Sequence, residues 1–327
     1  MMRAPAFWWQ RTGLPALCLA PLAALYGLFS GRRMKRGGAK ATLPVVCIGN
    51  LVVGGAGKTP TAMRLAEALK ERGRRPVFLS RGYGGTLVGP VRVEPAHHSS
   101  RQVGDEPLLL ASVAPTVVAR DRVKGAEFAA QWGDVILMDD GLQNPSLHKD
   151  FSIAVVDAGQ GIGNGWCLPA GPLRAPLRAQ WSRVDACLVI GEDIAPVAEF
   201  VRSVPVALFY GQLLTDALQA ETYRGLKVLA FAGIGRPEKF FETLEGLGAI
   251  VAEKRWFGDH HRYQPSEIKA LLSDAEAKRL VPVTTTKDAV KIRETAHDAL
   301  HAIRVLEIGL QVSDFDNLIN LLIKKIY

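Results

Sequence analysis

Residues 52–59 constrain this chain more than any other segment, because they place glycines, a lysine and a hydroxyl residue in one short turn. The segment reads VVGGAGKT, and it lies between an apolar run of strand length (43–48) and a stretch with helical spacing of apolar residues (61–72). A phosphate chain requires close approach of the backbone, which glycine permits, and N–H groups at the start of a helix. The segment therefore predicts a phosphate-binding loop between a buried strand and a helix.

Each residue type in this loop has an expected role toward a bound nucleotide. Lys58 supplies a cation for the phosphates, and Thr59 supplies a hydroxyl for Mg²⁺. Val52 stands where the common pattern GxxxxGK[ST] has its first glycine, so that pattern is met only in part. The residues expected at the nucleotide are Val52, Val53, Gly54, Gly55, Ala56, Gly57, Lys58 and Thr59.

Apolar runs along the chain predict an α/β fold of the P-loop NTPase type. The strands expected in the core are 43–48, 76–79, 116–119, 135–138, 152–156, 186–190 and 206–209. Strands that are apolar throughout and separated by helices indicate a mostly parallel sheet with helices on both faces. A second series of strands and helices begins near residue 224. We therefore expect an ATP-binding core over residues 41–220 and a smaller C-terminal α/β subdomain over residues 221–327.

Composition agrees with a folded chain that binds phosphate. The 327 residues carry a formal net charge of +8, and 48% of them are apolar. A basic balance favours partners with phosphate groups, whether nucleotide, anionic lipid or nucleic acid. None of the four cysteines forms a CxxC pair, which gives no support to a zinc site or a disulfide framework.

Residues 14–30 form an uncharged apolar segment near the N-terminus. As a helix, its 17 residues would be about 25 Å long, near the lower limit for crossing a bilayer. A cleaved signal peptide, a buried core helix and an uncleaved anchor are the three alternatives, and the anchor either spans the membrane or lies in its interface. Five basic residues follow the segment within ten positions, whereas only Arg3 and Arg11 precede it, which favours an anchor with the rest of the chain in the cytoplasm. We assign residues 1–40 to this anchor and its basic linker.

An acidic pair follows one of the expected core strands. Asp139 and Asp140 come directly after the apolar run 135–138. Carboxylates at such a strand end lie beside the phosphate loop of this fold, where they can hold Mg²⁺ or its waters. A helix cap is the simpler explanation of an isolated pair, but the nearby loop favours the metal.

Proton transfer and charge neutralisation have separate candidates. His260, in FGDHHRY, has a side chain whose pKa suits proton transfer near neutral pH, whereas Asp105 suits an N-cap as well as a catalytic partner. Arg174, in PAGPLR, is a candidate for neutralising phosphate charge. Arg81, Arg120 and Arg122 are weaker candidates for the same role.

Eight segments, taken in order, resemble one family. They are GNLVVGGAGKTP, SRGYGG, VGDEPLLLA, MDDGLQN, GNGWCLPAGPLR, FAGIGRPEKFF, FGDHHRY and TTTKDAVKI. Together they resemble the tetraacyldisaccharide 4'-kinase family of lipid A biosynthesis, and the likeness extends over nearly the whole chain, including the N-terminal segment.

This resemblance implies transfer of the γ-phosphate of ATP to the 4'-hydroxyl of a tetraacyldisaccharide 1-phosphate. It implies ATP and Mg²⁺ as cofactors, a glycolipid substrate at a membrane surface, and a location on the cytoplasmic side of a bacterial inner membrane. Neither nucleic acid nor an obligate protein partner is expected. Asp105 and His260 are expected to activate the acceptor hydroxyl with Lys58 at the phosphates, and Thr59, Asp139 and Asp140 to serve the metal.

Two residues depart from the family pattern. Asn144 stands where the family usually has histidine, and Ala175 stands where it usually has glutamate. The loss of that glutamate bears on nucleotide affinity and rate rather than on the reaction class.

Two other classes of protein compete with a lipid kinase. A P-loop GTPase or ATPase without a lipid acceptor would share the loop, but the guanine-reading pattern [NT]KxD is not met, because Ala289 stands where its aspartate belongs. A membrane-tethered binding module would not need the loop, the acidic pair and the Asp–His set together.

Overall fold

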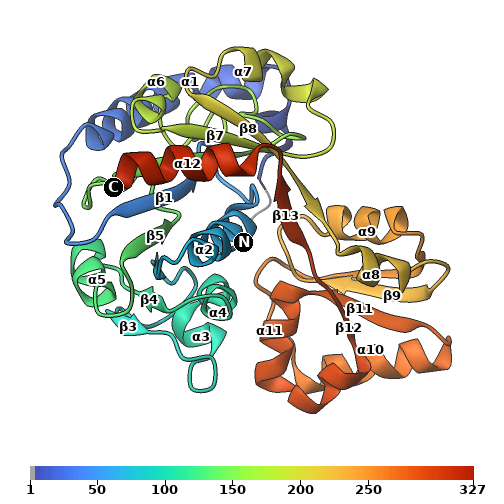
Figure 1. Cartoon of the computed structure of the whole chain (residues 1–327). Coiled ribbons are helices and arrows are strands. Elements are labelled where there is room, and N and C mark those ends of the chain that lie inside the picture. The colour runs from blue at the N-terminus through green and yellow to red at the C-terminus, as the bar shows by residue number, and fades with distance from the viewer. Residues whose placement is uncertain (1–3) are drawn as a thin grey trace.

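The computed structural model describes residues 4–327, and it contains two sheets joined by a pair of strands (Figure 1). The larger sheet has nine strands in the order β13-β8-β7-β6-β1-β5-β2-β4-β3. The strands from β8 to β4 are parallel, whereas the two edge strands are antiparallel to their neighbours. The predicted mostly parallel α/β sheet is therefore confirmed. Its strands are β1 (Val45–Asn50), β2 (Pro76–Ser80), β3 (Val91–Arg92), β4 (Thr116–Val118), β5 (Val135–Asp139), β6 (Phe151–Asp157), β7 (Ala186–Ile190), β8 (Ala207–Leu214) and β13 (Gly309–Val312).

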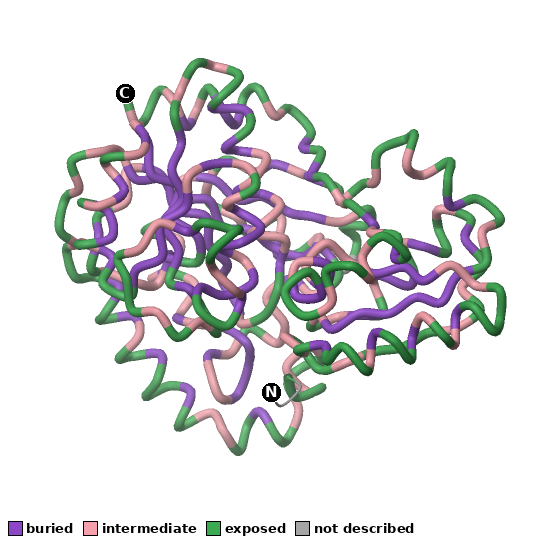
Figure 2. Tube along the Cα trace, turned by 90° about the horizontal axis from the view of Figure 1, so that it is seen from below, coloured by how far each residue is buried: buried purple, intermediate pink, exposed green. Residues whose placement is uncertain are grey.

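Helices cover both faces of this sheet, and the buried core lies between them and the strands (Figure 2). The apolar residues of α2 repeat at helical spacing and are buried against one face, together with residues of α4 and α12. Residues of α5, α6 and α7 pack on the other face. The bounds are α2 (Lys58–Glu71), α3 (Ser100–Val103), α4 (Asp105–Ala111), α5 (Arg122–Ala129), α6 (Leu177–Trp181), η2 (Ala195–Val197), α7 (Ala198–Arg202) and α12 (Phe315–Ile326).

The smaller sheet has four parallel strands in the order β10-β9-β11-β12. Apolar residues of α9 pack on one face, and those of α10 and α11 pack on the other. Its strands are β9 (Lys227–Ala232), β10 (Ile250–Trp256), β11 (Val281–Thr285) and β12 (Arg304–Leu306). Its helices are α8 (Ala217–Glu221), α9 (Pro237–Gly246), α10 (Pro265–Ala277), α11 (Thr286–Thr295) and η3 (His297–Ala302).

The C-terminal end of the chain corrects one predicted boundary. We expected residues 221–327 to form the smaller unit throughout, but β13 pairs with β8, with Leu310 opposite Leu213. The helix that follows, α12, buries Leu318 and Leu322 in the core of the larger sheet. An amphipathic helix must cover an apolar face, and α12 covers the one beside α2. The chain therefore passes between the two units twice, through β8 and through β13.

The N-terminal helix α1 (Leu14–Met34), preceded by η1 (Ala6–Trp9), lies along the outside of the larger unit (Figure 1). Its small residues face the protein, because a Cβ added at Gly27 or Gly31 would lie 3.4 or 3.6 Å from Pro176. Its large apolar residues are exposed instead, and they include Leu14, Leu17, Leu22, Leu25, Leu28 and Phe29. This pattern is the opposite of a buried core helix, which excludes that alternative.

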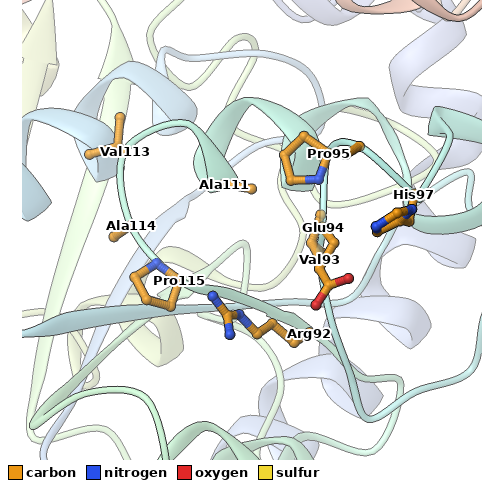
Figure 3. A pocket seen from close by; sticks show the side chains of 10 residues that line it. Arg92, Val93, Glu94, Pro95, His97, Ala111, Val113, Ala114 and Pro115 are labelled. Atoms are coloured by element: carbon orange, nitrogen blue, oxygen red, sulfur yellow. The ribbon is translucent and has the colours of Figure 1, made fainter.

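A surface hollow lies at the β3 edge of the larger sheet (Figure 3). Arg92, Glu94 and His97 line it together with alanine, valine and proline side chains. None of the candidate catalytic, nucleotide-binding or metal-binding residues contributes to its lining. We therefore look for the functional site at the carboxyl ends of the parallel strands, where ligands bind in open α/β sheets.

Replacing Leu322 by alanine should destabilise the larger unit by about 2–5 kcal/mol, because the side chain is fully buried and its loss leaves a cavity. Chemical denaturation of the full chain measures the change. Leu218→Ala on α8 is the control, since that side chain is 82% exposed. Equal effects of the two substitutions would contradict the placement of α12 in the core.

Candidate active site

The glycine-rich loop connects β1 to the first turn of α2, as the sequence predicts. Gly57 has a φ of +86°, and an added Cβ would lie 2.8 Å from Cδ1 of Ile190. Both facts favour glycine there, because L side chains rarely adopt this conformation. The Nδ2 group of Asn50 donates to the carbonyl of Gly54 at 2.9 Å, which fixes the loop from the strand side.

A second segment runs beside this loop and holds it from outside. The N–H of Val53 donates to the carbonyl of Pro172 at 2.9 Å, and the N–H of Arg174 donates to that of Leu51 at 3.0 Å. The Nε group of Arg174 adds a bond to the carbonyl of Val52 at 3.0 Å. The arginine predicted to neutralise phosphate charge is therefore attached directly to the loop.

Two cations of the site converge on one carboxylate, that of Asp140. Nη1 of Arg174 lies 2.7 Å from its Oδ1 atom, and Nζ of Lys58 lies 3.7 Å from the same atom. Burial alone would raise the pKa of Asp140, but Lys58 and Arg174 bring it below its ordinary value. Asp140 also has a positive φ of 50°, an uncommon conformation that turns it away from the strand. The carboxylate is thus ionised at neutral pH and gathers positive charge beside the loop.

The neighbouring carboxylate, Asp139, differs in its surroundings. It ends β5, is 5% exposed, and its Oδ1 atom has no hydrogen-bond partner among residues 4–327. Burial raises the pKa of Asp139 to about 6, against the opposing effect of Lys58, and the carboxylates of Asp140 and Glu106 add to the rise. A buried oxygen without a partner calls for a ligand, and a hard cation is one that it suits.

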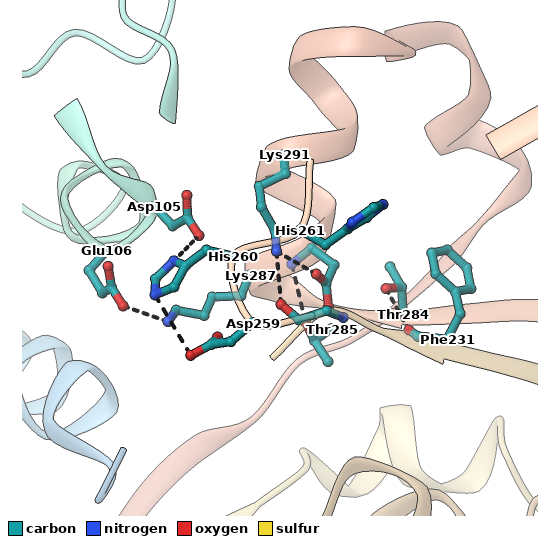
Figure 4. A network of polar contacts seen from close by, with 12 residues as sticks. Asp105, Glu106, Phe231, Asp259, His260, His261, Thr284, Thr285, Lys287 and Lys291 are labelled. Atoms are coloured by element: carbon teal, nitrogen blue, oxygen red, sulfur yellow. Dashed lines mark hydrogen bonds and ion pairs between the residues drawn. The ribbon is translucent and has the colours of Figure 1, made fainter. Parts of the chain in front are cut away.

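A hydrogen bond between the two units joins Asp105 to His260 (Figure 4). Asp105 is the first residue of α4 and is 6% exposed, while His260 lies in the loop after β10 with a φ of +59°. Their Oδ2 and Nδ1 atoms are 2.9 Å apart, and this bond raises the pKa of His260. Burial by itself would raise the pKa of Asp105, but the bond from His260 and nearby lysines lower it. The geometry matches an imidazole oriented by a carboxylate.

Further polar contacts hold the two units together beside this pair. Nζ of Lys287, on α11, lies 2.5 Å from a carboxylate oxygen of Glu106, the residue after Asp105 (Figure 4). The hydroxyl of Ser100, before α4, donates to Glu294 of the same helix α11 at 2.9 Å. The position of His260 relative to Asp105 is therefore fixed by neighbours on both sides.

A second connection lies at the end of β6. Asp157 accepts hydrogen bonds from Lys239 at 2.5 Å and from Arg236 at 3.2 Å. Both cations come from the start of α9, in the smaller unit. Together with the contacts of α11, this pair connects the smaller unit to two different places on the larger sheet.

Comparison with known proteins identifies the family of this chain. Residues 15–327 match the family model described as tetraacyldisaccharide-1-P 4'-kinase, LpxK. The chain belongs to this family. The tetraacyldisaccharide 4'-kinase of Methylobacterium sp. (strain 4-46) is 55% identical over 319 residues, which cover 96% of this chain and 95% of that protein. That of Bradyrhizobium diazoefficiens is 50% identical over 296 residues, covering 89% of this chain and 87% of that protein.

A solved structure of the family supports the fold. The crystal structure of LpxK from Aquifex aeolicus, described as an apo form in complex with ATP, has a TM-score of 0.77 and 27% sequence identity. The alignment covers 96% of this chain and 100% of that chain.

The two departures from the family pattern have plain structural descriptions. Asn144 closes a turn, in which its side-chain oxygen accepts the N–H of Ser146 at 2.8 Å. Ala175 is fully buried, and its methyl side chain has no oxygen to offer at that position. Of the weaker arginines, Arg81 is exposed, and Arg122 is buried and donates to the carbonyl of Ala119.

Sequence reasoning gave no role to several residues that shape this candidate site. Glu106 and Lys287 pair across the two units although 181 positions separate them, and no motif predicts such a pairing. Gln180 is fully buried and Gln143 is partly buried, and their side chains are hydrogen-bonded to each other beside the glycine-rich loop. The only signal for Gln180 is a polar residue among apolar neighbours in a short helix, which is common on protein surfaces.

Proposed function

We propose that this chain transfers the γ-phosphate of ATP to the 4'-hydroxyl of a tetraacyldisaccharide 1-phosphate, which gives a 1,4'-bisphosphorylated lipid A precursor. The observation that carries the proposal is the hydrogen bond from His260 to Asp105, because it brings a proton acceptor of the smaller unit to the side of the larger unit that bears the loop. Membership in the family and the ATP complex of the Aquifex aeolicus relative support the choice of substrates.

ATP binding falls to the loop and to the two cations at Asp140. The backbone N–H groups of the loop and the start of α2 suit the phosphates, and Gly57 allows their close approach. Lys58 and Arg174 form ion pairs with Asp140 in this structure, and a bound phosphate chain would also interact with both cations. Transfer of a phosphoryl group depends mainly on positioning and on charge stabilisation, which these groups supply.

Mg²⁺ would be held by Asp139 and by the hydroxyl of Thr59, with Asp140 beside them. Asp139 fits best, because its Oδ1 atom is buried without a partner, whereas Asp140 already binds two cations. Residues 4–327 include no cluster of three Asp, Glu, His or Cys side chains that could hold a metal alone. That suits Mg²⁺, which usually keeps waters and substrate phosphates as ligands. When bound, it neutralises charge on the transferring phosphate.

His260 would accept the proton of the 4'-hydroxyl. Its Nδ1 group donates to Asp105, which leaves Nε2 as the acceptor. The bond holds the ring in this tautomer and stabilises the cation that forms when the proton arrives. Because the two residues belong to different units, their relative placement decides whether the acceptor can react.

A transfer assay tests the proposed reaction. Wild-type protein in detergent micelles should move labelled γ-phosphate from ATP to tetraacyldisaccharide 1-phosphate. We expect kcat to fall about 10³-fold in Lys58→Ala and about 10²–10⁴-fold in His260→Gln. The controls are Lys227→Ala and His297→Gln, which change exposed residues of the same types. Consumption of ATP without added glycolipid would favour the alternative, an ATPase without a lipid acceptor.

The rate should depend on pH through His260, which must be neutral to accept a proton. Its pKa is raised by the bond to Asp105, so activity should rise with pH along a limb centred above the ordinary value of 6.5. Asp105→Asn removes the anion, which should move this limb to lower pH and lower the plateau by about 100-fold. Asp298→Asn, at a fully exposed carboxylate, is the control. An unshifted limb in Asp105→Asn would exclude His260 as the titrating group.

Asp139→Asn should stabilise the free protein but weaken its use of Mg²⁺. With a pKa raised from 3.8 to about 6, ionisation of Asp139 opposes folding between about pH 4 and 6 and to the full extent above pH 6. The amide removes this opposition, so the melting temperature at pH 8 should rise, whereas at pH 4 it should not. The Mg²⁺ concentration for half-maximal transfer should increase. A lower melting temperature at pH 8 would mean that the carboxylate has a partner in solution.

We also propose that α1 lies in the membrane interface on the cytoplasmic side of the inner membrane. In the described part of the chain, α1 is the single helix long and apolar enough to cross a membrane. Its packing against Pro176 aligns it with the surface of the larger unit, and its exposed leucines suit the acyl region. The exposed Arg32, Arg33, Lys35 and Arg36 at its end suit anionic headgroups.

Replacing Leu22, Leu25 and Phe29 together by glutamine should release the protein from vesicles that contain anionic lipid. Flotation of the protein with those vesicles measures this. Leu218→Gln, at a leucine of α8 that is even more exposed, should leave binding unchanged. Wild-type protein should also be extracted from membranes at alkaline pH, and resistance to that extraction would mean that α1 spans the bilayer instead.

A further inference from the structure

A buried amide, that of Gln180, connects the segments that form the nucleotide site. Gln180 lies in α6 and is fully buried. Its Nε2 group donates to the carbonyls of Ala175 at 2.7 Å and of Leu51 at 3.1 Å, and its Oε1 atom accepts from Nε2 of Gln143 at 2.8 Å. Both hydrogens and the oxygen of this amide are therefore in use.

Gln143 extends this arrangement to the acidic turn. Its Nε2 group also donates to the carbonyl of Asn50, the last residue of β1, at 2.7 Å. Gln143 follows Asp140 by three positions, so it moves with the turn that carries the two carboxylates. The two amides thus join the start of the phosphate loop, the acidic turn after β5 and the segment after Arg174.

Arg174 is the residue that this pair of amides places. Its own N–H donates to Leu51, and the next carbonyl along the chain, that of Ala175, accepts from Gln180. Its guanidinium then reaches both Val52 and Asp140. Without Gln180, the carbonyl of Ala175 would be buried without this donor, and the chain beside Arg174 would lose its fixed distance from the loop.

Packing alone does not account for a glutamine at this place. A buried amide is unfavourable unless all of its hydrogen bonds form, and an apolar side chain of similar size would fill the same volume. Fully satisfied polar networks make a buried region rigid. Here the segments that the network holds rigid are the phosphate loop and the chain beside Arg174.

We propose that Gln180, acting with Gln143, is a positioning residue for phosphate transfer, which sets Arg174 against the phosphate loop. This inference rests on the proposed kinase function. The side chain of Gln180 is fully buried and bonds to Ala175, Leu51 and Gln143, so its effect on the reaction must pass through Arg174 and the loop. Loss of Gln180 should therefore weaken the binding of ATP rather than that of the glycolipid.

Gln180→Met tests the proposal, because methionine keeps the volume and removes the hydrogen bonds. We expect the KM for ATP to rise about 10-fold and kcat to fall by a similar factor, with the KM for glycolipid unchanged. In an Arg174→Ala background the same substitution should add little, because the residue it acts through is gone. Gln131→Met, at an exposed glutamine, is the matched control.

Two further measurements separate positioning from simple destabilisation. Leu322→Ala lowers stability on the face of the larger sheet opposite to α6, so it should leave the KM for ATP unchanged. If Gln180→Met does not fold, Gln143→Met is used instead, because it removes the hydrogen bond between the two amides at a partly buried residue. The same changes in KM and kcat are expected. Calorimetric binding of ATP tests the proposal apart from catalysis, so failure of glycolipid phosphorylation alone would count against the proposed function and not against Gln180. A lower melting temperature with unchanged ATP affinity, or full additivity with Arg174→Ala, would overturn the proposal.

Discussion

The contact between Asp105 and His260 is the interaction on which the rest of the proposed site depends, because it joins the unit of the larger sheet to that of the smaller sheet. The larger unit fixes Asp105 at the start of α4, and the smaller unit presents His260 from a loop with a positive φ. The ion pair of Glu106 with Lys287 lies beside it and joins α4 of the larger unit to α11 of the smaller unit. A proton acceptor built in this way works only when the two units are placed so that His260 reaches Asp105.

The N-terminal segment is connected to the same site through one stretch of chain. The indole N–H of Trp8 donates to the carbonyl of Pro169 at 3.0 Å, and the N–H of Asn164 donates to the carbonyl of Trp8 at 2.8 Å. The stretch that receives these bonds continues to Arg174 and the phosphate loop. If α1 lies at the membrane surface, this connection holds the proposed nucleotide site at a fixed distance from that surface. The headgroup of a glycolipid substrate would be found there.

The sequence predicts the parts of the structure that depend on local pattern. The uncharged runs 135–138 and 186–190 fall within β5 and β7, because strands that are buried on both faces are apolar throughout. The glycine-rich segment 52–59 leads into the first turn of α2 as expected. The edge strand β10 has no such apolar composition, because its residues Glu253, Lys254 and Arg255 are charged. The apolar stripe of α12 indicates a helix but cannot say which sheet it covers. Contacts between distant segments, such as that of Glu106 with Lys287, have no sequence signal in a single chain.

The most direct test of the central claim is a double-mutant cycle on kcat for glycolipid phosphorylation, with Asp105→Ala, His260→Ala and the double variant. If the two residues act as one unit across the interface, the double variant should be about as slow as His260→Ala alone. If the two losses multiply instead, Asp105 and His260 act independently, and their hydrogen bond is not the basis of catalysis.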